Sequence, residues 1–370
     1  IAYLLSLIYQ IFMIKKFIEN NKNHVQAVIL KKCGLAPNIT PWLTALINYS
    51  QIGTSVLVFR SGLEGYLAFL SAIGLQMEPL KTSLDCLLHL LGVRGFSTVS
   101  LKVICIMASP FFKLAIFAAY CYIKRGIKIL KKKQQNELTQ PWIKLVCATL
   151  VLAIMEHPDM ISVLFSYITC RQLDPNSEIT YSMLNNSIQC NTTEYLIFLY
   201  TFILPMIWLW AIAIPTTFFM IPYRNRHQLN TDTRFRILFG SLVSSYTDEC
   251  FFWGSGVMFF KVVLLIVTTF ITDLKILAFT LISCFYCYLF AIRRLKPYRQ
   301  DALQDNMPLV VSSYITTVFV TYYYKDNDYP LLKYASAAIL GVLNLFTIGC
   351  LVFHTVVIIR LQRRVQKDNK

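Results

Sequence analysis

The chain has 370 residues, of which 56% are hydrophobic, 14% aromatic and only 15% charged. Soluble domains carry about 25% charged residues, so this composition excludes a soluble globular enzyme, a disordered segment, a coiled coil and a secreted disulfide scaffold. Lys and Arg outnumber Asp and Glu to give a net charge of +16, and because they stand between apolar runs they indicate membrane topology rather than nucleic-acid binding.

The apolar runs predict an all-α, polytopic bundle of membrane helices. A bilayer core of about 30 Å requires roughly 20 apolar residues per helix, and about nine runs approach that length. The predicted spans cover residues 1–17, 41–59, 101–123, 142–166, 195–221, 251–272, 274–293, 307–324 and 331–359. The sixth and seventh are separate spans only if the chain turns tightly at Thr272, Asp273 and Leu274.

Alternate loops carry most of the Lys and Arg residues, and this asymmetry predicts the orientation of the spans. Basic residues concentrate on the cytoplasmic side of membrane helices. Here they gather after the first, third, fifth and seventh predicted spans and in the tail, residues 360–370. We therefore expect the N-terminus outside the cell and the C-terminus in the cytoplasm.

The first apolar run begins at residue 1, without an initiator Met and without the basic segment of a signal peptide. We therefore expect residues 1–370 to be a single transmembrane domain, the C-terminal part of a larger protein whose preceding region is extracellular. Two longer segments, residues 61–100 and 167–194, are also expected outside. The apolar stretches of the first segment are too short to span, which favours interfacial or re-entrant helices.

The outer loop between the fourth and fifth spans contains two cysteines and two glycosylation sequons. Cys170 and Cys190 can form a disulfide there, and Cys86 could instead pair with either of them. The sequons begin at Asn185 and Asn191, so we expect N-glycosylation of this loop.

A basic cluster follows the third span on the predicted cytoplasmic side. Ile and Leu alternate with its charges, so the segment can continue the span as an amphipathic helix and attract anionic lipid at about 1 kcal/mol per charge. The simpler interpretation is that these residues only set the topology. The cluster consists of Lys124, Arg125, Lys128, Lys131, Lys132 and Lys133.

Ionisable residues inside the predicted spans form an intramembrane polar cluster. Lys113 and Lys261 lie near the middle of the third and sixth spans. Glu156 and Asp159 lie in the fourth span, with His157 between them. An unpaired charge in the bilayer costs about 3 kcal/mol or more, so these residues should pair.

Two interpretations of this polar cluster stay open. The favoured one is a set of structural ion pairs that lock the third, fourth and sixth spans together. The other is a polar path or cation site, with Glu156 and Asp159 as ligands and the two lysines as gates or counter-ions. Pro158 should kink the fourth span, because it lacks a backbone N–H.

No catalytic or cofactor-binding motif appears in the sequence. It contains no HExxH, GxSxG, P-loop or glycine-rich dinucleotide turn, and its five histidines are scattered. Cys284 and Cys287 form a CxxC in the middle of an apolar span without a second pair, so we expect them to be small buried hydrophobes. We expect no enzymatic activity and no cofactor or metal.

Several different short motifs lie between about residue 40 and residue 310. They are Asn48-Tyr49-Ser50-Gln51, Ser83-Leu84-Asp85-Cys86, His157-Pro158, Phe165-Ser166, Cys170, Ile214-Pro215, Phe239-Gly240, Tyr246, Phe252-Trp253, Lys261, Lys296-Pro297-Tyr298 and Asn306. Together they resemble the C-terminal membrane module of large cysteine-rich surface proteins of ciliates and other protists. That module is similar to the C-terminal region of transient-receptor-potential and polycystin-like proteins.

This resemblance implies a many-pass anchor that follows a long, cysteine-rich extracellular region. Two positions depart from the pattern of the module. Gly254 stands where the module usually has an acidic residue, and Phe260 stands where it usually has an arginine. If those charges support ion conduction elsewhere, the resemblance implies that this chain has kept anchoring and lost conduction.

We therefore expect a surface protein of the plasma or ciliary membrane that holds an extracellular assembly to the bilayer. The alternative is a polycystin-like or TRP-like cation channel or transporter subunit, with Glu156 and Asp159 facing a wet path. A receptor is less favoured, because no DRY-like or NPxxY-like motif is present. The expected partners are lipid, extracellular structural proteins or the chain's own N-terminal region, and further copies of the chain, but not nucleic acid.

Overall fold

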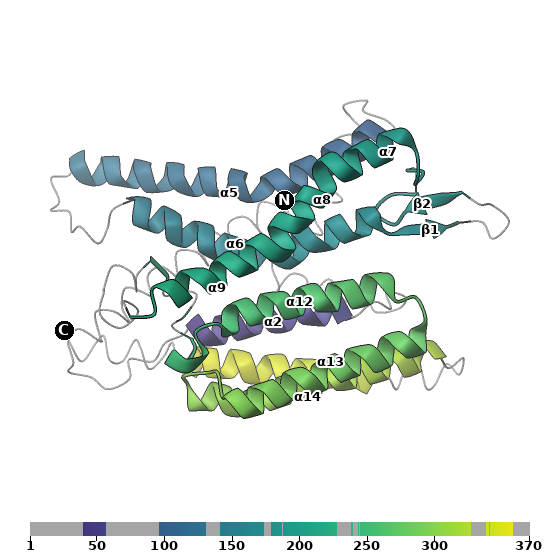
Figure 1. The fold of residues 1–370 in the computed structure, drawn as a ribbon. Coiled ribbons are helices and arrows are strands. Elements are labelled where there is room, and N and C mark those ends of the chain that lie inside the picture. Colours follow the sequence, from purple (N-terminus) through teal and green to yellow (C-terminus); the bar gives the residue numbers. More distant parts are fainter. Residues whose placement is uncertain are drawn as a thin grey trace.

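Helices in two layers form the structure, a computed structural model shown in Figure 1. The first layer contains α5 (Phe96–Leu130), α6 (Pro141–Ile168) and a segmented helix made of α7 (Thr193–Phe198), α8 (Leu204–Ile207) and α9 (Ile214–Arg224). The second contains α2 (Thr40–Val56), α12 (Trp253–Phe270), α13 (Leu274–Leu295), α14 (Asp301–Asp326) and the helix Gly341–Val357. The structure describes residues 40–56, 96–130, 141–173, 179–186, 188–227, 238–239, 243, 245–326, 338–339 and 341–357.

The helix α12 joins the two layers. Val257 and Leu264 on one side of it are buried with side chains of α2, α13 and α14. Val262 and Leu265 on another side are buried with side chains of α5, α6 and the segmented helix. Because these two buried sides lie next to each other, Ser255 and Lys261 of α12 also lie inside the protein, while Phe259, Val263 and Ile266 are exposed.

Five helical stretches are long and apolar enough to cross a membrane, and they coincide with the third to seventh predicted spans. They are Val99–Ile127, Trp142–Ile168, Thr193–Arg224, Trp253–Phe270 and Leu274–Leu295. The second and eighth predicted spans are also helical, as α2 and α14, but they are not among these five. Helices that pack inside a bundle can carry more polar residues than helices that face lipid. The chain is thus a helical membrane protein, and the count of nine spans stays a prediction.

The stretch Thr193–Arg224 departs from a regular α-helix. It passes through two π-helical segments, η2 (Leu199–Ile203) and η3 (Trp208–Ala213). Pro205 and Pro215 stand just after these segments. A proline cannot bond to the carbonyl four residues earlier, and the wider π turn accommodates the carbonyls left without that partner.

α12 and α13 form a tight helical hairpin at the turn that separates the sixth and seventh spans. Asp273 Oδ1 accepts hydrogen bonds from the backbone N–H groups of Lys275 and Ile276, both at 2.9 Å. These bonds satisfy two N–H groups that lack partners at the start of a helix. Lys296 directly follows α13 as its C-terminal cap, and its φ of 46° lies in the left-handed region.

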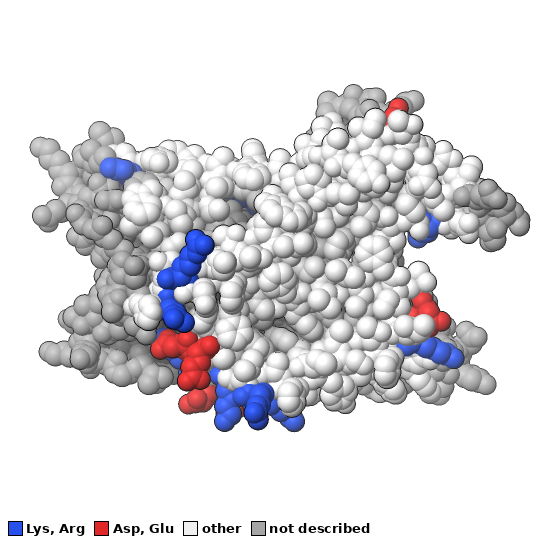
Figure 2. Space-filling view, in the orientation of Figure 1, with Lys and Arg blue, Asp and Glu red and all other residues white. Residues whose placement is uncertain are grey.

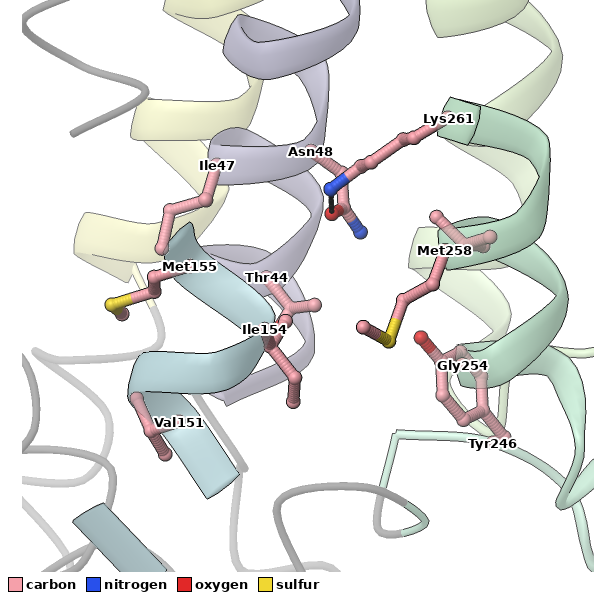
Figure 3. A pocket seen from close by; sticks show the side chains of 11 residues that line it. Thr44, Ile47, Asn48, Val151, Ile154, Met155, Tyr246, Gly254, Met258 and Lys261 are labelled. Atoms are coloured by element: carbon pink, nitrogen blue, oxygen red, sulfur yellow. Dashed lines mark hydrogen bonds between the residues drawn. The ribbon is translucent and has the colours of Figure 1, made fainter. Parts of the chain in front are cut away.

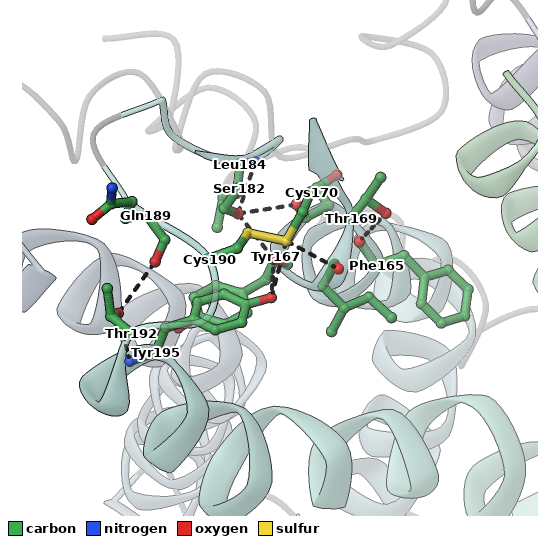
Figure 4. The surroundings of a disulfide bond; sticks show 12 residues. Phe165, Tyr167, Thr169, Cys170, Ser182, Leu184, Gln189, Cys190, Thr192 and Tyr195 are labelled. Carbon is green, nitrogen blue, oxygen red and sulfur yellow. Dashed lines mark hydrogen bonds between the residues drawn. A yellow bond between two sulfur atoms is a disulfide. The ribbon is translucent and has the colours of Figure 1, made fainter. Parts of the chain in front are cut away.

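A small β-hairpin interrupts the otherwise helical fold in the loop after α6, where the sequence predicts no strands. β1 (Cys170–Gln172) pairs antiparallel with β2 (Thr180–Ser182). A disulfide joins Cys170 to Cys190 (Figure 4), which is one of the pairings that the sequence left open. Ser182 Oγ donates a 2.9 Å hydrogen bond to the Tyr167 carbonyl, so the hairpin is fixed to the end of α6.

Charged side chains gather toward the two ends of the bundle, and the face in Figure 2 is uncharged between them. One end, which we call the basic end, includes the last part of α5, the start of α6, the end of α9 and the α13–α14 connection. Its exposed basic residues are Lys124, Arg125, Arg224, Arg226, Arg293, Arg294, Lys296 and Arg299. The opposite end carries the β-hairpin and the α12–α13 turn.

Several predicted features lie outside the described residues. They are the first span at residues 1–17, residues 61–95 with Cys86, the side chains of Lys128, Lys131, Lys132 and Lys133, and the tail at residues 360–370.

Candidate functional site

Three of the charged residues predicted inside the membrane lie near the middle of their helices. Lys113 is central in α5, Glu156 is close to the centre of α6, and Lys261 is central in α12. All three are buried, Lys113 and Glu156 between α5 and α6 and Lys261 between α12 and α2. Their side chains are almost inaccessible to solvent, so each charge requires a partner from the protein.

An ion pair connects α5 and α6. Lys113 Nζ lies 2.5 Å from Glu156 Oε1, and the two side chains are only 4% and 1% exposed. A buried pair of this kind neutralises both charges, and it stabilises the fold only while both partners are present.

Lys261 connects α12 to α2 through two neutral amides. Its Nζ donates to Asn48 Oδ1 at 2.7 Å and to Gln51 Oε1 at 2.6 Å. Gln51 Nε2 then donates to the backbone carbonyl of Met155 on α6 at 2.9 Å. Met155 directly precedes Glu156. A polar network of Lys113, Glu156, Gln51, Asn48 and Lys261 therefore links four helices across the interface of the layers.

The other two members of the predicted cluster lie on the same turns of α6. Asp159 is 5% exposed, and its carboxylate acts electrostatically on Lys261. His157 is fully buried and faces the backbone of Trp210 in η3. The structure thus buries all five predicted residues on α5, α6 and α12, but it does not join them in one direct set of contacts.

The predicted cluster did not include the two amides of α2. Asn48 and Gln51 are separated from Lys261 by 213 and 210 positions in the chain. The sequence does contain a sign of this polar site, because polar residues are costly inside a membrane and two amides at helical spacing in one span are therefore unusual. In the sequence the two amides stand out only as part of the motif Asn48-Tyr49-Ser50-Gln51.

A second polar cluster lies on another side of α2. The Tyr49 hydroxyl donates a short hydrogen bond to Asn344 Oδ1 on the helix Gly341–Val357. Asn344 Nδ2 donates to Thr317 Oγ1 of α14 at 3.3 Å, and Ser313 Oγ donates to the Tyr49 hydroxyl at 3.4 Å. These contacts fix α2 against α14 and the helix that follows it.

A small cavity of about 40 Å³, part of it open to the outside, lies between α2, α6 and α12 (Figure 3). Its lining residues follow the spacing of single helix faces: Thr44, Ile47 and Asn48 on α2; Val151, Ile154 and Met155 on α6; Gly254, Val257, Met258 and Lys261 on α12. Most of this lining is apolar. Neither Glu156 nor Asp159 belongs to it.

Tyr246 lines the cavity near its Gly254 end and precedes the first turn of α12. A β-bridge to Tyr298 holds it in place, and the Thr247 N–H donates to the Pro297 carbonyl at 2.8 Å. Burial, reinforced by the neighbouring Tyr298, raises the pKa of Tyr246 well above its ordinary value. The phenol therefore stays protonated at physiological pH.

The predicted surface sites are only partly described. Asn191 is exposed with a φ of 65°, and the adjacent Thr192 caps α7 by accepting a hydrogen bond from the Tyr195 N–H. Asn185 is half-buried. In the basic cluster, the side chains of Lys124 and Arg125 are exposed at the basic end.

Among the described residues, no group of three or more His, Cys, Asp or Glu side chains is arranged to hold a metal ion. Comparison of the chain with protein families, with curated proteins and with solved structures finds no match.

Proposed function

We propose that the chain is a multi-pass anchor that holds an extracellular assembly at the cell surface. The observation that carries this proposal is the polar network, in which Lys113, Glu156 and Lys261 each bind a partner on another helix. A network of this kind holds four helices at a fixed distance and orientation. It suits a rigid support better than a path in which charged groups must meet water and ions.

The charge distribution supports the accompanying orientation. Exposed Lys and Arg side chains concentrate at the basic end, which we place in the cytoplasm. The disulfide between Cys170 and Cys190 lies at the opposite end, and disulfides persist in the oxidising space outside the cell. The β-hairpin and the α12–α13 turn would then face the extracellular partner.

Two measurements on the full chain in cultured cells test this function. Whole-cell recording should find no current above that of untransfected cells. External cross-linking with a membrane-impermeant reagent should join the chain to other surface proteins, and a Glu156→Met variant should lose this product in proportion to its lower surface level. Lys124→Met, an exposed change on α5, should leave both the product and the surface level unaltered.

The alternative, a cation channel or transporter subunit, predicts a different result. A cation current in the wild type that vanishes in Glu156→Gln or Asp159→Asn at unchanged surface level would contradict the anchor and establish conduction. The cavity lining argues against a cation path, because Lys261 is its one charged residue among those described.

A further inference from the structure

The last turn of α13 carries basic side chains that the anchoring function does not use. Arg293, Arg294 and Lys296 are exposed within four successive positions. Figure 2 shows basic side chains gathered at the α13 end of the basic end. Like charges this close repel one another, so an anion between them would stabilise this end of the helix.

Several other cations of the basic end already interact with a neighbouring side chain. These pairs are Arg299 with the carboxylate of Asp248, Lys124 with the hydroxyl of Tyr120, and Arg226 with the ring of Tyr223. Among the described residues, Arg293, Arg294 and Lys296 have no side-chain partner. Their three positive charges can therefore bind an anion without breaking a contact of the fold.

A strip of exposed aromatic side chains on α13 leads to these cations. Phe279, Tyr286 and Phe290 are 74%, 58% and 71% exposed. Their spacing of seven and four positions keeps them on one side of the helix. Arg293 and Arg294 follow Phe290 by three and four positions, so they continue the same side. In a membrane helix such a strip faces acyl chains, and the basic residues at its end reach the headgroups.

We propose that this end of α13 is a docking site for an anionic phospholipid, with the headgroup phosphate at Arg293, Arg294 and Lys296 and an acyl chain along Phe290 and Tyr286. Guanidinium groups match phosphate oxygens in charge and geometry, and the aromatic side chains contact the acyl chain. A free phosphate would meet the same cations but not the aromatic strip. The proposal goes beyond anchoring and is independent of it, because it depends only on this end of α13.

Native mass spectrometry of the full chain in detergent micelles measures the binding, with dioleoylphosphatidylglycerol as the probe. Dioleoylphosphatidylcholine, which has the same chains but no net charge, is the reference. We expect the first phosphatidylglycerol to bind roughly 10-fold tighter than phosphatidylcholine, because each basic residue near the headgroups adds to the attraction. The double variant Arg293→Gln, Arg294→Gln should lose most of this preference. Arg224→Gln with Arg226→Gln removes the same charge at the end of α9 and should keep it.

Phe290→Ala and Phe279→Ala form a matched pair on one helix, since both side chains are highly exposed. Phe279 stands 14 positions before Arg293, or about 21 Å along the helix, which exceeds half of a bilayer core of about 30 Å. An acyl chain held at Arg293 therefore stays in the other leaflet. Phe290→Ala should weaken phosphatidylglycerol binding several-fold, and Phe279→Ala should bind it like the wild type. This pair keeps the test decisive if the arginine variant does not fold.

Four results would overturn the proposal. The first is equal binding of phosphatidylglycerol and phosphatidylcholine to the wild type. The second is an equal loss of preference in the two double variants, which would show attraction by the whole basic end. The third is equal binding of phosphatidylglycerol by Phe290→Ala and Phe279→Ala. The fourth is displacement of the lipid by glycerol 3-phosphate, which carries a phosphate without acyl chains and would identify a site for free phosphate.

Discussion

Lys113 Nζ and Glu156 Oε1 lie 2.5 Å apart in the interior of the bundle, on side chains that are almost inaccessible. Lys113→Met or Glu156→Met leaves the other charge without this partner, and we expect each variant to lose about 3 kcal/mol of stability. The double variant should lose clearly less than the sum, because neither charge remains. Thermal unfolding in detergent micelles measures all three.

Lys124→Met is the control for these three variants, since Lys124 is an exposed lysine on α5, the helix that carries Lys113. It should change stability by less than about 0.5 kcal/mol. If the losses of the two single variants simply add in the double variant, the ion pair contributes no coupling, and the locking role assigned to it is wrong.

Tyr49→Phe removes one hydroxyl that connects α2 to Asn344 and Ser313. Hydrogen bonds between membrane helices contribute about 0.6 kcal/mol on average and up to about 1.7 kcal/mol. We expect a loss toward the upper value, because the hydroxyl takes part in two buried bonds. Unfolding midpoints of Tyr49→Phe and of Tyr122→Phe, an exposed tyrosine on α5, provide the comparison. Equal midpoints would show that this cluster is energetically neutral.

Lys296→Gly should stabilise the protein by up to about 1 kcal/mol. Lys296 ends α13 with a φ of 46° and ψ of 59°, and left-handed backbone costs a residue with a side chain about 1–2 kcal/mol, partly offset by the greater freedom of glycine when unfolded. Asn191→Gly is the control, because asparagine tolerates the φ of 65° found there. Unfolding midpoints should rise for the first variant only, and a fall for Lys296→Gly would contradict the expectation.

Reduction of the disulfide between Cys170 and Cys190 should loosen the β-hairpin. The two cysteines are 20 positions apart, and closing a loop of this length contributes about 3 kcal/mol. We expect a Cys170→Ser variant to be cut by protease between α6 and α7 much faster than the wild type. Cys287→Ser should leave the cleavage rate unaltered, because Cys287 is a free cysteine far from this loop; it is exposed and Cys284 is half-buried, so the prediction that both are buried was wrong. Equal rates in all three proteins would show that the bond is dispensable there.

Labelling of single introduced cysteines tests the orientation. The two variants are Lys275→Cys and Arg226→Cys. Lys275 lies at the α12–α13 turn, and Arg226 follows α9 at the basic end. In intact cells a membrane-impermeant thiol reagent should label the first and not the second, with wild-type labelling as background. Permeabilised cells should label both. Labelling of Arg226→Cys alone in intact cells would invert the proposed orientation.

The helical membrane character of the chain follows from local sequence alone. The length of each apolar run decides whether a segment can cross a bilayer, and Asp273 marks the turn between α12 and α13 because its carboxylate caps the next helix. Patterns of this kind need only neighbouring residues. The sequence therefore located the helices from α5 to α13 and identified the charged residues that require partners, but it did not predict the two short strands.

Only the tertiary structure decided which partners those residues have. Lys113 bonds to Glu156, whereas Lys261 bonds to Asn48 and Gln51, more than 200 positions away in the chain. The tertiary structure also decided the position of the cavity, which is lined mainly by one face each of α2, α6 and α12. Such contacts depend on how each helix is rotated and which helices it packs against. The rotation and the neighbours of each helix depend on the packing of the whole bundle, so they cannot be predicted from a single stretch of sequence.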